Sequence, residues 1–303
     1  MSLSVVQKAI MTGHNAAVYA LEQGIDAEYI LSGSADNMVA MWSLKDFVPQ
    51  NFSVQLEATI YSICFIPDKS ILLVGQTNGG IHVIDLNATK EIRHLALHTG
   101  AIFSIKYTPK TNQFYVGSAD GSVSIWDLEQ CSLITHNQIS SKKIRSIYID
   151  EQLDDYLIVD GDGQITVFDL ANNKSLKSFI GHDLSANCLA RNPITNELLT
   201  GGRDAHLKVW NTNYELIKAI PAHNFAIYDI AFHPTGKYLA TASRDKTIKI
   251  WDANTYEVLV RLDRINYNGH TNSVNKLYWS TYNNYLLSTG DDRSIIVWEV
   301  LEN

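Results

Sequence analysis

Apolar and polar residues alternate along the chain in short segments that are separated by turn residues. Between residues 61 and 96, such segments cover 61–66, 71–75, 81–85 and 91–96. Alternation with a period of two predicts β-strands that have one buried face. Asx-Gly pairs, such as Asn78-Gly79, Asp120-Gly121 and Asp162-Gly163, predict tight turns between the second and third strands of each group. We therefore expect an all-β chain built from groups of four strands.

These groups repeat through the whole sequence with a spacing of 41 to 47 residues. The repeat is marked by seven large apolar residues near the end of each third strand: Trp42, Ile84, Trp126, Phe168, Trp210, Trp251 and Trp298. Six residues before each marker stands an Asp or Asn, and 28 residues before most of them stands a His. A four-stranded sheet cannot bury both of its faces alone, so the units are expected to pack against one another around a closed ring. We expect one domain of residues 1–303.

Paired residues connect this repeat to a known family. Gly-His pairs occur at Gly13-His14, Gly181-His182 and Gly269-His270, and Trp-Asp pairs occur at Trp126-Asp127 and Trp251-Asp252. With its period of about 40 to 45 residues, the chain resembles the WD-repeat β-propeller family over essentially its whole length. The resemblance implies a seven-bladed propeller whose ring is closed by an N-terminal strand that completes the last blade. Residues 5–11 look like that strand.

Four blades combine Ser or Thr, His, Asp and Trp at equivalent positions. The four sets are His14, Ser32, Asp36 and Trp42; His182, Thr200, Asp204 and Trp210; His223, Thr241, Asp245 and Trp251; and His270, Ser288, Asp292 and Trp298. A Ser-His-Asp set can serve nucleophilic catalysis. However, repetition in four blades and the lack of a Gly-x-Ser-x-Gly elbow favour structure. The resemblance implies hydrogen-bonded tetrads that tie each blade together.

The other three blades depart from this pattern. Blade three keeps His98, Asp120 and Trp126 but has Val116 at the hydroxyl position, so its network is expected to be partial. Blades two and four lack both the His and the Trp and are expected to be the softer blades.

The composition narrows the classes of partner. Lys and Arg total 24 against 32 Asp and Glu, a net charge of −8, which argues against attraction to nucleic acid or anionic lipid. Three cysteines without a Cys-x-x-Cys motif are expected to be free thiols in a reducing compartment. Without a signal peptide or a membrane-spanning segment, a cytoplasmic protein is predicted. No zinc helix, phosphate loop or dinucleotide motif is present, so neither a metal nor a cofactor is expected.

In propellers of this family, the face that carries the Gly-His loops and Asp turns commonly receives ligands, and the positions around these loops give the candidate site. Blades one to three place aromatic residues there, an aromatic arc, and blades four to seven place basic residues, including Lys246 and Arg293, a basic arc. The predicted partner-binding residues are Tyr19, Tyr61, Phe103, Lys143, Arg145, Asn187, Arg203, Tyr228, Arg244, Tyr267 and Asn275. Tyr267 belongs to about five extra residues, 264–268, in the loop that enters blade seven.

Aromatic and Arg side chains are the residues that binding hot spots favour. The predicted function is a non-catalytic scaffold, monomeric outside a complex, that binds a protein or peptide with apolar anchors and acidic or phosphorylated residues. Alternatively, the aromatic residues plug the channel mouth and the basic residues are only solvated. Two further alternatives are a hydrolase-like propeller enzyme with its site at the channel mouth and a nucleic-acid-binding propeller.

Overall fold

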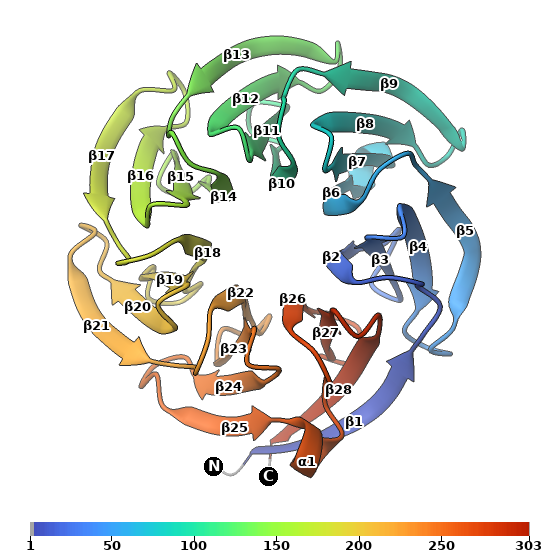
Figure 1. Ribbon diagram of the computed structural model, residues 1–303, viewed down its shortest axis with the longest axis vertical. Coiled ribbons are helices and arrows are strands. Elements are labelled where there is room, and N and C mark those ends of the chain that lie inside the picture. Colours follow the sequence, from blue (N-terminus) through green and yellow to red (C-terminus); the bar gives the residue numbers. More distant parts are fainter. Residues whose placement is uncertain (1–2, 303) are drawn as a thin grey trace. The chain divides into compact units, whose positions relative to one another are not determined.

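The computed structural model describes residues 3–302, and in this range the chain forms seven four-stranded antiparallel sheets (Figure 1). Each sheet is one blade, numbered here by its order along the chain. The predicted fold class, a seven-bladed WD-repeat propeller, is confirmed. Met1, Ser2 and Asn303 lie outside the described residues, and the single-domain organisation of residues 1–303 stays a prediction.

The blades fall into two compact units. Unit 1 comprises Met1–Glu57 and Cys188–Asn303, and unit 2 comprises Ala58–Asn187. Within unit 2, the first strands of the sheets, β6, β10 and β14, lie side by side (Figure 1).

Unit 2 contains blades two, three and four. Blade two has β6 (Ile60–Ile66), the 3-10 helix η1 (Pro67–Lys69), β7 (Ile71–Gln76), β8 (Gly80–Asp85) and β9 (Lys90–Ala96). Blade three has β10 (Ile102–Thr108), β11 (Gln113–Ser118), β12 (Ser122–Asp127) and β13 (Ser132–Gln138). Blade four has β14 (Ile144–Asp150), β15 (Asp155–Asp160), β16 (Gln164–Asp169) and β17 (Ser175–Ile180). The four strands predicted for blade two are confirmed to within one residue at each end.

The remaining blades belong to unit 1, although β18 begins just before its boundary. Blade one has β2 (Val18–Gln23), β3 (Tyr29–Ser34), β4 (Met38–Ser43) and β5 (Pro49–Gln55). Blade five has β18 (Ala186–Arg191), β19 (Leu198–Gly202), β20 (His206–Trp210) and β21 (Leu216–Pro221). Blade six has β22 (Ile227–Phe232), β23 (Tyr238–Ser243), β24 (Ile248–Asp252) and β25 (Val258–Leu262). Blade seven has β26 (Val274–Trp279), β27 (Leu286–Gly290), β28 (Ile295–Glu302) and β1 (Leu3–Met11), and α1 (Arg264–Tyr267) precedes it.

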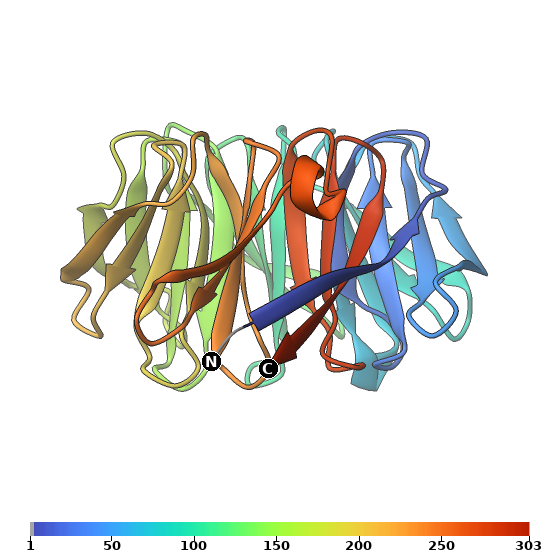
Figure 2. The same cartoon turned by 90° about the horizontal axis from the view of Figure 1, so that it is seen from below.

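The first strand of the chain completes the last blade, as predicted. β1 pairs antiparallel with β28, and the register places Val5 opposite Val300 and Met11 opposite Ile295 (Figure 2). Met11 is 1% exposed, and Val5 is also buried. The strand therefore contributes apolar side chains to the core as well as hydrogen bonds to the edge of β28.

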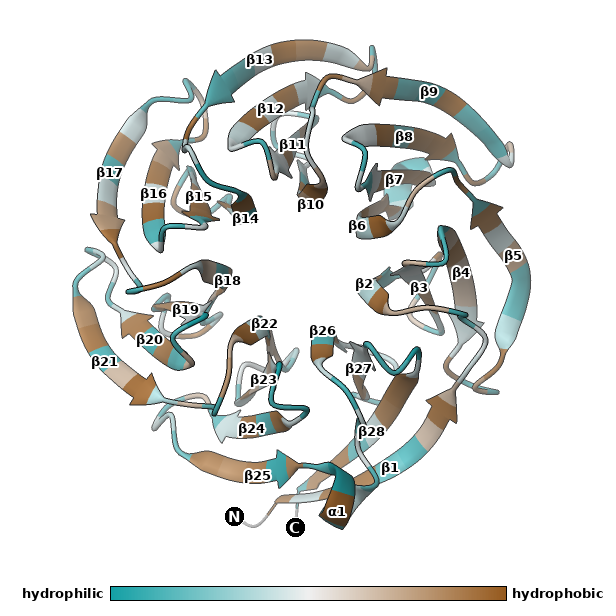
Figure 3. Ribbon diagram, in the orientation of Figure 1, coloured by the Kyte–Doolittle hydropathy of each residue, from teal (hydrophilic) through white to brown (hydrophobic). Residues whose placement is uncertain are grey.

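Burial differs between the inner and outer strands of a blade. Every residue of β7 is buried, whereas β5 alternates between exposed and half-buried residues. A strand that is covered on both faces reads as a continuous apolar run, whereas an outer strand keeps one polar face (Figure 3). The indole rings of Trp42, Trp251 and Trp298 are among the largest fully buried side chains.

The turns between second and third strands use left-handed residues in both units. In unit 2 these residues are the predicted glycines Gly79, Gly121 and Gly163, with φ between 81° and 87°. In unit 1 they are Asn37, Ala205, Lys246 and Arg293, with φ between 63° and 73°. The same turn is thus made by glycine in one unit and by residues with a Cβ in the other.

Candidate functional site

Four predicted residues form one cluster in unit 2, on the side of the Gly-His loops and Asp turns. The rings of Tyr61 on β6 and Phe103 on β10 have centroids 5.2 Å apart. The Arg145 guanidinium lies 4.6 Å from the centroid of the Phe103 ring, and the Lys143 ammonium lies 5.9 Å from it. This aromatic-cation cluster joins residues of both predicted arcs, because Lys143 and Arg145 of the basic arc lie over the ring of Phe103 of the aromatic arc.

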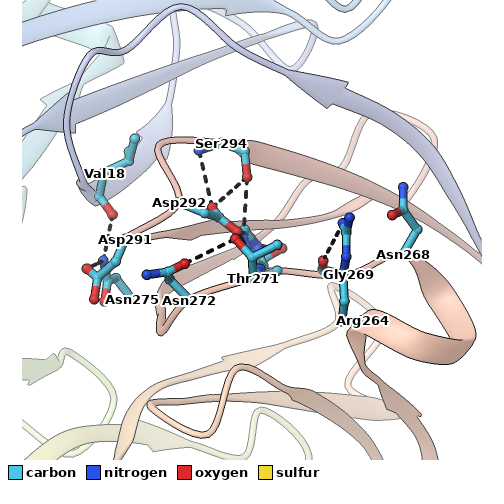
Figure 4. Close-up of polar contacts among 12 residues, drawn as sticks. Val18, Arg264, Asn268, Gly269, Thr271, Asn272, Asn275, Asp291, Asp292 and Ser294 are labelled. Carbon is cyan, nitrogen blue, oxygen red and sulfur yellow. Dashed lines mark hydrogen bonds and ion pairs between the residues drawn. The ribbon is translucent and has the colours of Figure 1, made fainter.

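Other predicted residues have internal roles. Asn187 is 8% exposed and accepts a hydrogen bond from the Ser185 hydroxyl at 2.9 Å. Asn275 donates to the Val18 carbonyl at 3.2 Å and to Asp291 at 2.8 Å (Figure 4). These two side chains hydrogen-bond within the protein itself, and their role as partner contacts stays a prediction. Tyr19 and Tyr228 are half-buried in unit 1, and Arg203 is exposed there.

A second aromatic-cation pair was missed by sequence reasoning. Phe225, on the loop before β22, is 57% exposed, and the Arg244 guanidinium lies 5.9 Å from its ring centroid. Leu184 occupies the corresponding loop position in unit 2 and is 48% exposed. Both residues stand two positions after the repeated His. The sequence signal that could have revealed this pair is an apolar residue at this loop position, where the other repeats have a small or polar residue.

The inserted residues 264–268 form the short helix α1 and the residue after it. The Asp263 side chain caps the helix by accepting a hydrogen bond from the Asn266 amide. Gln7 on β1 exchanges hydrogen bonds with Asn268, which follows α1 (Figure 4), at 2.9 and 3.2 Å. Tyr267, a predicted contact residue, packs against a core cluster of unit 1, whereas Ile265 is 91% exposed. Tyr267 thus anchors the insertion, and Ile265 is its outermost side chain.

The repeated polar residues of blade seven form a closed network. Trp298 Nε1 donates to Ser288 Oγ at 2.9 Å, and His270 Nε2 lies 2.9 Å from the same hydroxyl. Because the Asp292 carboxylate can only accept, His270 donates to it from Nδ1 at 2.9 Å, and Nε2 of a neutral ring then accepts the proton of the Ser288 hydroxyl. Asp292 also accepts from the Thr271 amide and the Ser294 hydroxyl (Figure 4).

Blades one and six repeat this network. In blade one, His14 lies 2.9 Å from Asp36 and 2.7 Å from Ser32, to which Trp42 donates at 2.7 Å. In blade six, the corresponding distances are 3.0 Å for His223–Asp245, 2.8 Å for His223–Thr241 and 2.9 Å for Trp251–Thr241. In blade five, Trp210 donates to Thr200 at 2.9 Å. The hydroxyls, imidazoles and carboxylates of blades one, six and seven hydrogen-bond to one another, as a structural network requires.

Blade three has a complete network, so the expectation of a partial one was wrong. His98 Nε2 lies 2.7 Å from Ser124 Oγ, and Trp126 Nε1 donates to the same oxygen at 2.7 Å. Ser124 pairs directly with Val116 across β11 and β12. The hydroxyl has therefore moved to the opposite strand at the same level of the sheet, which a position-by-position comparison of repeats does not reveal.

Blade two replaces the tetrad with a different network. His82 Nε2 lies 2.7 Å from Gln76 Oε1, and Nδ1 lies 2.8 Å from Glu91 Oε1. Gln76 also donates from Nε2 to the Ala58 carbonyl at 2.8 Å. The ring of His94 stacks on His82 with centroids 4.5 Å apart.

The ionisation of these networks fits a structural role. Burial alone would raise the pKa of Asp120, but hydrogen bonds from Ser122 and Thr99 and the attraction of His98 lower it to about 2. The pKa values of Asp245 and Asp292 are lowered in the same way, against burial, by their His partners. Burial lowers the pKa of His98 and His223 despite their Asp partners. At neutral pH the carboxylates are therefore charged and these two imidazoles neutral.

Within residues 3–302, no three His, Cys, Asp or Glu side chains are grouped so that they could hold a metal ion. Cys64, Cys131 and Cys188 form no disulfide, and Cys64 and Cys188 are buried. No helix of the described chain is long and apolar enough to cross a membrane.

Comparisons with known families agree with the fold. The model of the WD domain, G-beta repeat, matches residues 6–43, 214–252 and 263–299, which lie in unit 1. The model of the NUP159/214 beta propeller matches residues 40–192, about half of the chain, including all of unit 2. No curated protein matches the chain. The chain belongs to the WD-repeat β-propeller family, whose members typically are non-enzymatic scaffolds for protein interaction.

Proposed function

We propose that the protein is a non-catalytic scaffold that binds a peptide segment of a partner protein at the aromatic-cation cluster of Tyr61, Phe103, Lys143 and Arg145. The observation that carries this proposal is the Arg145 guanidinium held 4.6 Å from the Phe103 ring, with Tyr61 beside it. Tyr and Arg are the residues that binding hot spots favour. If Lys143 and Arg145 did not lie over an aromatic ring, the alternative that these basic residues are only solvated would be favoured.

The chemistry of the cluster defines the partner segment. Two aromatic rings offer apolar contact area, and Arg presents planar donors that match a carboxylate or a phosphate. The partner segment therefore carries an apolar anchor next to an acidic or phosphorylated residue. The exposed pair of Phe225 and Arg244 in unit 1 repeats this chemistry and supports the same class of partner.

An enzyme is the weaker alternative because the Ser-His-Asp sets are engaged in internal hydrogen bonds. Asp292, for example, accepts from His270, Ser294 and the Thr271 amide, and its lowered pKa suits a charged acceptor rather than a general base at neutral pH. The net charge of −8 also disfavours a nucleic-acid partner. Three cysteines that form no disulfide support a reducing, cytoplasmic location.

The test is affinity capture from native lysate with crosslinking, using the wild type and the Phe103→Ala and Arg145→Glu variants. Both variants are expected to lose the same captured proteins. Lys177→Glu is the matched control, because Lys177 also lies over a phenyl ring, that of Phe179, 5.8 Å away on the outer strand β17. Unchanged capture by both variants, or equal loss in the control, would remove the cluster from consideration.

A further inference from the structure

A cavity of about 570 Å³ lies within unit 2, at the strand ends opposite to the Gly-His loops and Asp turns. It is bounded by the end of β6 with η1 and by the end of β10 with the turn that follows it. The volume is within the range of about 300–1,000 Å³ that is typical of ligand sites. The cavity is separate from the aromatic-cation cluster, which occupies the other ends of the same sheets.

The walls of the cavity are aromatic and prolyl. Phe65 and Pro67 form one side, and Tyr107 and Pro109 form the other. The Tyr107 hydroxyl donates to Asn112 Oδ1 at 3.1 Å, which fixes the orientation of the half-buried ring. The cavity therefore offers flat, rigid apolar surfaces that lose little conformational entropy when a ligand binds.

Carboxylates surround the phenol of Tyr107. Burial raises the pKa of Tyr107, and the nearby charges of Asp68 and Glu151 raise it further. Asp68 itself lines the cavity, and Glu151 accepts a hydrogen bond from the Thr108 hydroxyl. An anionic ligand would be repelled here, and a cation would be attracted.

The cations near the cavity do not cancel this field. Lys110, next to Pro109, forms an ion pair with Asp154. Lys69 also lines the cavity and offsets the charge of Asp68, so the negative charge that remains near Tyr107 is that of Glu151. Acidic residues also outnumber basic ones in the loops that connect the strands at this end of unit 2, counted together with the residues on either side of each loop.

We propose that this cavity binds an arginine side chain presented by an extended basic segment of a partner protein. A guanidinium can stack on the rings of Tyr107 and Phe65 and donate to the Asp68 carboxylate, while its aliphatic stem contacts the prolines. A lysine ammonium matches the carboxylate less well because it lacks the planar, forked donors. This site is independent of the proposed function, since it uses different residues and the opposite charge.

The proposal is tested with the full-length protein and a fluorescein-labelled peptide, Gly-Ser-Ala-Arg-Ala-Ser-Gly, by fluorescence anisotropy. A peptide with citrulline in place of arginine keeps the shape but removes the charge, and we expect it to bind about tenfold more weakly. Asp68→Asn should weaken binding of the arginine peptide by a similar factor. Glu129→Gln is the matched control, because it makes the same charge change on an exposed residue of blade three outside the cavity lining.

Substitutions of Tyr107 test whether ring stacking contributes to binding, and Asp68→Asn serves if one of them prevents folding. Tyr107→Phe keeps the ring and should retain the affinity within about twofold, whereas Tyr107→Leu should weaken binding about tenfold. If Tyr107→Leu does not fold, Asp68→Asn in the exposed η1 still decides the question. Equal binding of the arginine and citrulline peptides, equal loss in Glu129→Gln, or equal binding of a neutral proline-rich peptide would overturn the proposal. Arg145→Glu should leave this binding unchanged, so the two sites fail or succeed separately.

Discussion

Unit 1 and unit 2 hold the same kind of blade together in different ways. Blades one, six and seven of unit 1 use the same His, Ser or Thr, Asp and Trp network at equivalent positions. Two blades of unit 2 have their own solutions: Gln76–His82–Glu91 in blade two and Ser124 in blade three. The difference shows that a blade requires a satisfied polar network rather than particular residues.

The units also differ in their turns and in the strand that completes them. In the turns between second and third strands, unit 2 uses glycine at the left-handed position, whereas unit 1 uses larger residues there. Unit 1 alone depends on pairing between the two ends of the chain, through β1 and β28. These contrasts lead to four predictions, in order of decreasing effect.

Removing residues 1–11 should destabilise unit 1 far more than unit 2. Val5 and Met11 are buried, and each contributes about 1.5–3 kcal/mol, so with the lost strand pairing we expect a loss of about 5 kcal/mol or more. Urea unfolding measures the total loss, and hydrogen exchange should show that amides of β26 to β28 lose protection before those of unit 2. Removal of residues 1–2 alone is the control. Equal unfolding midpoints for the two truncated proteins would contradict the role of β1.

The left-handed turn positions between second and third strands should respond oppositely to substitution in the two units. A Cβ at Gly121 would lie 2.1 Å from the Ser140 carbonyl oxygen, so Gly121→Ala should cost about 3 kcal/mol. Arg293 already holds a left-handed φ of 68°, so Arg293→Gly should raise stability by about 1 kcal/mol. Thermal and urea unfolding of both variants measure these changes. A mild effect of Gly121→Ala would mean that the turns of the two units are interchangeable.

Moving one hydroxyl tests whether blade three uses the same network as unit 1. Ser124→Ala leaves the His98 ring and the Trp126 indole without their shared partner and should cost about 2 kcal/mol. Adding Val116→Ser to this variant returns the hydroxyl to the position it has in unit 1 and should recover part of the loss, because the two residues pair directly. Urea unfolding of the single and double variants gives the coupling energy.

Thr166→Val is the control for the hydroxyl experiment. Thr166 lies 2.9 Å from Ser178 in an exposed hydrogen bond, so its removal should change stability by less than about 0.5 kcal/mol. If Ser124→Ala were equally mild, or if Val116→Ser gave no recovery, blade three would not depend on the hydroxyl.

The fold could be predicted from the sequence because seven repeats at regular spacing leave little freedom in the number and pairing of strands. It also placed β1 correctly, since the last unit lacked a fourth strand. It missed Ser124 because cross-strand neighbours become adjacent only once the register of β11 and β12 is known. It missed the cavity between Phe65 and Tyr107 because its walls come from two blades and their turns carry no repeated motif. Asn187 and Asn275 have hydrogen-bond partners within the protein that the sequence did not reveal, because position in a repeat does not determine which polar side chains are used internally.

The smallest predicted effect is a loss of stability between pH 7.5 and 6.5 that the two units share. Burial lowers the pKa of His98 in unit 2 and of His223 in unit 1, below the ordinary value near 6.5. The folded protein keeps both rings neutral, whereas the unfolded chain takes up protons as the pH falls through 6.5, so stability is present above this pH and is lost below it. For two such groups the loss over this interval is about 0.7 kcal/mol. Urea unfolding at the two pH values measures this loss, and imidazole NMR signals of His98 and His223 in the folded protein should show less protonation at pH 6.5 than in the unfolded chain, because burial lowers the pKa of both rings. If His98 gained a proton near pH 6.5 and His223 did not, the network of blade three would differ in charge from those of unit 1, although its geometry is the same.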